Sequence, residues 1–271
     1  RAEPAEALYR RILAGAAPGG PIAARAMISL ADLCEQSGRR EEMLAFLEKV
    51  AGDLDAPPAG RPSRGEGGAR GTALFRLGRY WLDAGDPAKA RKCFERWIPE
   101  SDCGTCAKEL VVERGWWPAR CLAGEHQEER ALAEHVDPLL PRDSPNGDYG
   151  IRVARLAVTL HEKTEGLQAF LGRAAAYPER SVGAIARELA RIRLRAVAGD
   201  IPALVAEVRQ HETGFVASIR SRDDRARDWR ALAAVRALAD MNGKEAPALL
   251  ARWGELFARV PQDTQNAAYG D

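Results

Sequence analysis

Two cysteines separated by two residues, Cys103 and Cys106, are the residues whose type and spacing most suggest chemistry. Thiols in this arrangement can close a disulfide, attack one, or bind a metal ion. A redox motif of this kind follows a strand in a βαβ unit, and the surrounding sequence shows no such pattern. A zinc site needs two further ligands, and the nearby candidates lie at irregular separations: Cys93, Cys121, His126 and His135. Three interpretations stay open: inert thiols, a structural disulfide or metal, and redox catalysis.

The other candidates for catalysis lack supporting residues. None of the four histidines belongs to a His-x-x-x-His or Glu-x-x-His motif, and we expect all of them at the surface: His126, His135, His161 and His211. The chain has no Gly-x-Ser-x-Gly elbow and no glycine-rich phosphate loop. Acidic residues are plentiful, but nothing selects one pair for a glycosidase site. We therefore predict no catalytic residues, no cofactor and no metal centre.

Composition places the chain among folded helical proteins. The 271 residues are 46% hydrophobic, and 40 Lys and Arg against 39 Asp and Glu give a formal charge of +1. This balance does not favour nucleic acid or a membrane surface as partner, and no apolar run reaches the roughly 20 residues of a membrane span. Alanine and arginine are common while β-branched and aromatic residues are sparse, which favours helices over strands. The five cysteines, an odd number, predict a reducing, cytoplasmic location.

The elements that would position any site are helical, and the stretch 71–97 shows this most clearly. Leu74, Leu77, Gly78 and Trp81 recur at helical spacing, Gly85-Asp86 breaks the run, and a second helical run follows with Ala90, Phe94 and Trp97. This pattern predicts a helical hairpin. In its Leu-Gly-x-x-Trp and Ala-x-x-x-Phe spacing it resembles the tetratricopeptide repeat (TPR) family of peptide-binding hairpins.

Similar helical runs extend over the whole chain. A first helix is predicted over 3–14, and paired runs over 22–36 with 39–51, 106–122 with 125–136, 151–162 with 165–177, 182–198 with 202–212, and 225–241 with 245–260. A kink or restart is expected at Pro118. Proline-rich loops are expected over 52–70 and 137–150, and 52–70 is either a spacer or a binding loop.

We therefore predict an all-α fold of about six antiparallel helical hairpins, forming one repeat domain over 1–271 with an insertion at 52–70. The turns are expected near residues 38, 85, 124, 164, 199 and 243. The TPR resemblance implies an open, right-handed α-solenoid. A closed ring of six hairpins is the competing architecture.

The resemblance also implies where a partner would bind. In the TPR family the first helix of each hairpin lines a groove, and the matching positions here are Phe75, Arg79 and Leu82. The alternative is that Phe75 packs against a neighbouring repeat while Arg79 is merely solvated. A second candidate is a strip of arginines four residues apart, which is either a docking strip for carboxylates or a solvated helix face beside Glu188: Arg187, Arg191 and Arg195.

The adjacent Trp116 and Trp117 have two interpretations: one ring fills the gap left by a kink at Pro118, or the other is an exposed anchor for a partner peptide, and we expect at least one ring to pack. The function we expect is a non-catalytic scaffold that binds a protein or peptide in the solenoid groove. The alternative is a regulatory or sensor arm of a larger enzyme or signalling protein, as the start at Arg1 suggests. Two further alternatives are a helical-toroid enzyme and a thiol or metal site at Cys103 and Cys106.

Overall fold

The computed structural model describes residues 2–54, 64–97, 104–143, 148–220, 229–241 and 243–259. These residues are helical with short connections, and they contain no strand, only an isolated bridge between Asp143 and Ser181. The all-α prediction is confirmed for this part of the chain. By their contacts the residues divide into two compact units, 1–127 and 128–271, and each unit is described by itself. The single domain over 1–271 and its open solenoid stay predictions.

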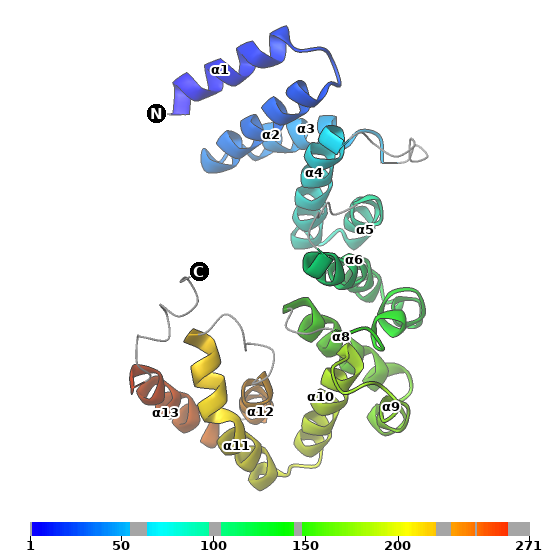
Figure 1. The fold of residues 1–271 in the computed structure, drawn as a ribbon, viewed down its shortest axis with the longest axis vertical. Helices are drawn as coiled ribbons and strands as arrows, with labels where there is room; N and C mark the ends of the chain where they lie inside the picture. Colours follow the sequence, from blue (N-terminus) through cyan, green and yellow to red (C-terminus); the bar gives the residue numbers. More distant parts are fainter. Residues whose placement is uncertain are drawn as a thin grey trace. The chain divides into compact units, whose positions relative to one another are not determined.

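Unit 1 consists of α1 (Ala2–Gly15), α2 (Pro21–Gln36), α3 (Arg40–Ala51), α4 (Arg64–Asp83), α5 (Pro87–Arg96) and α6 (Gly104–Gly124) (Figure 1). Each of these helices packs against the next, and α2 also packs against α4. Its core includes the fully buried side chains of Leu30, Leu47, Leu74, Leu77, Phe94 and Leu122. The hairpin predicted over 71–97 is thus the α4–α5 pair.

Gly78 explains how closely α4 and α5 approach one another. A Cβ atom at this position would lie 2.7 Å from Cζ of Phe94, which is too close for any side chain. Phe94 itself is fully buried, as is Ala90 one turn before it on α5. The small residues predicted to let the two backbones approach do lie at the contact.

Unit 2 contains α7 (Glu128–Ala131), the π-helical segment η1 (Leu132–Val136) and the 3-10 turn η2 (Asp137–Leu139). These are followed by α8 (Asp148–Thr164), α9 (Leu167–Ala174), α10 (Val182–Val197), α11 (Ile201–Arg220), α12 (Trp229–Asp240) and α13 (Glu245–Arg259). The pairs α8–α9, α10–α11 and α12–α13 pack as hairpins, and α10 also packs against both α8 and α12. First helices therefore contact first helices, as in stacked hairpins.

One backbone hydrogen bond recurs at six helix ends in the described part of the chain, each at a predicted turn. The N–H of the residue that follows the turn donates to a carbonyl oxygen five residues earlier, at distances of 2.8 to 2.9 Å. Such a bond closes the end of a helix. The accepting residues are Cys34, Trp81, Leu122, His161, Arg195 and Leu238, and we call this the turn position of each hairpin. It places Cys34 in register with Trp81.

The structure differs from the sequence prediction in several connections. Residues 64–70, expected as loop, are the first two turns of α4, where Ala69 is buried and Arg70 Nε donates to the carbonyl oxygen of Ala51 at 3.0 Å. These contacts outweigh the low helix propensity of the local glycines. Helix α6 runs through Pro118 without a restart. Part of the expected 137–150 loop is helical, and α11 continues beyond residue 212. Residues 55–63 lie outside the described part of the chain.

Candidate functional site

Phe75, the first predicted groove residue, belongs to an aromatic cluster that joins α4, α5 and α6. The cluster consists of Phe75, Phe94, Trp97, Trp116 and Trp117. The centroid of the Phe75 ring lies 4.9 Å from that of Trp97 and 5.4 Å from that of Trp117. Phe94 and Trp117 stack at 4.7 Å with an interplanar angle of 16°. Phe75 is half-buried by these contacts, which is the packing role that the sequence left open.

Trp116 and Trp117 are both buried, with 8% and 5% of their surfaces exposed. The alternative in which one ring is an exposed anchor is therefore wrong. The physical reason is that α6 packs against α5, so that the rings meet Phe94 and Phe75 rather than solvent. Arg120 covers part of the Trp116 ring, with its guanidinium carbon 5.4 Å from the ring centroid.

Arg79 is exposed, whereas Leu82 is half-buried. Within the described part of the chain, no hydrogen bond or ion pair holds the Arg79 guanidinium. Arg79 lies two residues before Trp81, which is the turn position of its hairpin. The residue two positions before each of the other turn positions is exposed as well. Four of these six residues are arginines: Arg79, Arg120, Arg193 and Arg236. Arg79 thus occupies a repeated, solvent-facing register on the first helix of its hairpin.

The arginine strip on α10 is paired within the protein. Arg191 Nη1 lies 2.7 Å from Glu188 Oε1, and Arg187 Nε lies 3.5 Å from the same oxygen. Arg195 Nη1 lies 2.7 Å from Glu207 Oε2 of α11. Each guanidinium already has an acidic neighbour, which supports the helix-face interpretation. The docking strip stays a prediction, and it would have to compete with these pairs.

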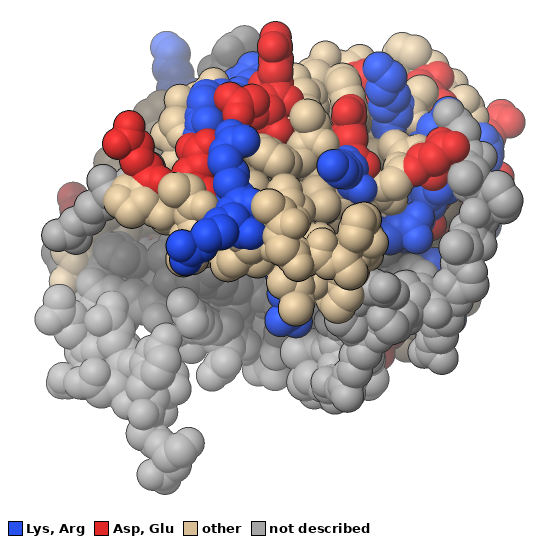
Figure 2. Space-filling model, turned by 90° about the horizontal axis from the view of Figure 1, so that it is seen from above, with Lys and Arg blue, Asp and Glu red and all other residues tan. Residues whose placement is uncertain are grey.

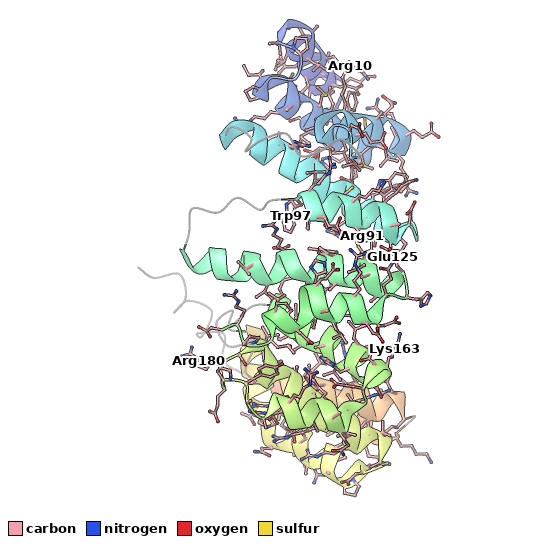
Figure 3. All side chains as sticks on the ribbon, turned by 90° about the vertical axis from the view of Figure 1, so that its right-hand side faces the viewer. Arg10, Arg91, Trp97, Glu125, Lys163 and Arg180 are labelled. Carbon is pink, nitrogen blue, oxygen red and sulfur yellow. The ribbon has the colours of Figure 1, made fainter. Side chains whose placement is uncertain are left out.

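Outside α10, positive and negative side chains also lie close together on the surface. Figure 2 shows Lys and Arg side chains interleaved with Asp and Glu on the face that it presents. Several ion pairs join helices that pack together, as where Arg76 of α4 pairs with Asp32 and Glu35 of α2 at 2.5 and 2.7 Å. Arg91 of α5 likewise lies 2.8 Å from Glu125, in the turn after α6 (Figure 3). Much of the surface charge therefore connects neighbouring helices.

The cysteines that the structure describes are inert. Cys34, Cys93 and Cys121 are buried free thiols, and burial raises the pKa of Cys93 and of Cys121 to about 12. A protonated thiol is a poor nucleophile and a poor metal ligand. Cys103 and the side chain of Cys106 lie outside the described residues, so their three interpretations stay open. Within the described part of the chain, no three His, Cys, Asp or Glu side chains are grouped so that they could hold a metal ion.

His161 overturns the expectation that all four histidines lie at the surface. It occupies the turn position of α8, and only 2% of its side chain is exposed. Its ring stacks on Phe170 of α9 with the centroids 4.4 Å apart and an interplanar angle of 15°. At the same position other hairpins have the buried apolar residues Cys34, Leu122 and Leu238. Alignment of the six turns in the sequence would have revealed a histidine at a core position.

Charged groups surround the His161 ring. Nε2 lies 3.0 Å from Asp137 Oδ1 of η2, and Nδ1 lies 2.7 Å from Glu165 Oε1 in the turn after α8. Arg173 of α9 approaches Nδ1 at 3.3 Å with Nη2, hydrogen-bonds to Glu165, and lies 4.0 Å from Asp137. We call Asp137, His161, Glu165, Phe170 and Arg173 the His161 cluster. Because both ring nitrogens are occupied and the ring is buried, His161 has no nitrogen free to act on an external substrate.

Comparisons of the chain with known protein families, with curated proteins and with solved structures found no match. None of the helices described has both the length and the apolar character needed to cross a membrane.

Proposed function

We propose that this protein is a non-catalytic helical-repeat scaffold that binds a peptide or partner protein along the first helices of its hairpins. The observation that supports the proposal is the repeated register: the same backbone hydrogen bond closes six described helix ends, and an exposed residue lies two positions before each accepting residue. Repeats of this kind stack into extended binding surfaces. The TPR-like pattern of the α4–α5 hairpin agrees with this function.

In unit 1, we propose that Arg79 contacts the bound peptide or partner protein. It is exposed, and its guanidinium is not engaged by any described residue, in contrast to Arg76 one turn earlier, which pairs with Asp32 and Glu35. An arginine on a rigid helix can bind a carboxylate with little ordering cost. The buried side of Phe75 packs in the aromatic cluster, so we assign it mainly to holding α4 in place.

A selection from a display library of extended peptides, followed by affinity measurements, tests this proposal. Peptides enriched on the wild-type protein should bind the Arg79→Glu variant at least about tenfold more weakly, because an attractive charge becomes repulsive. Arg40→Glu is the matched control. Arg40 is also exposed and has no partner among the described residues, but it lies on α3, a second helix. Equal loss in both variants, or no enriched peptide, would contradict the proposal.

A further inference from the structure

The His161 cluster brings two carboxylates to one buried imidazole. A neutral imidazole has one N–H and one bare nitrogen, so it can donate to only one of the two acceptors. Donation from Nε2 to Asp137 leaves Nδ1 to accept from Arg173 at 3.3 Å, with Glu165 Oε1 facing the same lone pair at 2.7 Å. The protonated ring instead donates to both carboxylates at once.

The charge balance of the cluster also changes with protonation. The His161 cluster carries one net negative charge when its imidazole is neutral, and none when the imidazole is protonated, because Asp137 and Glu165 are negative and Arg173 is positive. Two carboxylates lie within 3.0 Å of the ring nitrogens, and one guanidinium lies beside them. The carboxylates outnumber the guanidinium, and both meet the ring in hydrogen-bonding geometry.

We propose that His161 is a proton-operated clasp in unit 2, in which protonation adds the Nδ1–H···Glu165 hydrogen bond to the Nε2–H···Asp137 bond and tightens η2, α8 and α9 around one ring. The proposal does not depend on the binding function proposed above.

Titratable groups outside the His161 cluster lie near it, but most of them interact with other residues. Tyr177, after α9, has its pKa raised chiefly by burial and secondly by Asp137. Other charged groups on the elements packed against α8 pair away from His161: Glu128 of α7 with Lys163, Arg193 of α10 with Glu162, Glu134 of η1 with Arg130 and His135, and the arginines of α10 with Glu188 and Glu207. Glu129 of α7 is exposed.

The clasp connects mechanically to the next hairpin. Asp137 begins the connection whose later carbonyl oxygens hold the start of α10: Gly183 N donates to Leu140 O at 2.7 Å and Val182 N donates to Arg142 O at 3.0 Å. Tightening Asp137 onto His161 would therefore stabilise the N-terminal end of α10 as well as the α8–α9 hairpin.

Thermal unfolding and amide hydrogen exchange between about pH 5.5 and 8.5 test the proposal on the full chain. If the folded state makes a bond that needs the proton, it binds that proton more tightly than the unfolded state does, so stability rises as pH falls through this range. We expect the wild type to gain about 3 °C at the acidic end relative to His161→Leu, with slower exchange in α8 and α9. Leucine is chosen because Leu122 and Leu238 occupy the same turn position.

Two further variants keep the test decisive. Glu165→Gln replaces the charged acceptor with a neutral one of similar size, and it should reduce the same pH-dependent gain if His161→Leu does not fold. His126→Asn is the control, because His126 is exposed with a φ of 58°, which asparagine tolerates, and the gain should persist there. Nitrogen NMR shifts of the imidazole should show His161 doubly protonated at the acidic end. A neutral ring there, or the same pH dependence in the wild type and Glu165→Gln, would overturn the proposal.

Discussion

The aromatic cluster of unit 1 and the His161 cluster of unit 2 both hold neighbouring helices together, but by different forces. In the first, rings from α4, α5 and α6 meet face to face and edge to face. In the second, one ring from α8 is held by a stacked phenylalanine and by three charged groups. Ring packing depends on shape and is insensitive to pH, whereas charged hydrogen bonds depend on direction and on protonation. The same turn architecture therefore supports both a fixed contact and a proton-sensitive one.

The largest expected effect comes from removing the centre of the aromatic cluster. Phe94→Ala should destabilise the protein by about 3–5 kcal/mol, because it removes a fully buried ring and leaves a cavity beside Trp117. Urea unfolding at constant pH measures the change. Phe94→Leu should lose less, and the loss should not vary between about pH 6 and 8, where the His161 cluster is expected to respond. If the loss of unfolding free energy depended strongly on pH, the aromatic cluster would not differ from the His161 cluster in the way described.

A smaller loss of stability is expected at Gly78, where the packing leaves no room for a side chain. Gly78→Ala should cost about 1–3 kcal/mol, since its Cβ atom would meet three atoms of the Phe94 ring at 2.7 to 2.9 Å. Gly172→Ala on α9 is the matched substitution: a Cβ atom there meets nothing within 4 Å, and it should stabilise the helix by about 0.5–1 kcal/mol. The two changes in unfolding free energy should have opposite signs, and a loss at Gly172 would show that α9 is packed more tightly than described.

The smallest effect is expected at acidic pH, where α1 should lose stability as the pH falls. This direction is opposite to the one proposed for His161. Hydrogen bonds from Arg39 and then Arg10 lower the pKa of Glu6 on α1 from 4.5 to about 2. A lowered carboxyl pKa contributes stability that is present above 4.5 and is lost as the pH falls towards 2. Amide exchange in α1 should therefore accelerate over that interval in the wild type and change less in Glu6→Gln. Equal acceleration in both proteins would remove Glu6 as the acid-sensitive contact of this helix.

The positions of most helices were predictable because hydrophobic periodicity and turn residues are local signals. Gly38, Gly85 and Gly199 have the positive φ that a helix-ending turn needs, and each marks a predicted turn. The loop expected over 52–70 was the least accurate prediction. There the burial of Ala69 and the bond from Arg70 to Ala51, both tertiary contacts, decide that a glycine-rich stretch becomes helix.

The sequence by itself determined that the described chain is helical and where most of its turns lie, because these properties follow from the order of residues along one helix. Arg79 became a candidate through the TPR resemblance of its hairpin. Only the tertiary structure decided that Trp116 and Trp117 are both buried, that Arg195 pairs with Glu207 of α11, and that His161 is enclosed by Asp137 and Arg173. Burial and ion pairs between elements depend on which helices meet in space. Glu165 lies four residues after His161, but Asp137 of η2 and Arg173 of α9 come from other elements, and no local pattern brings those elements to one ring.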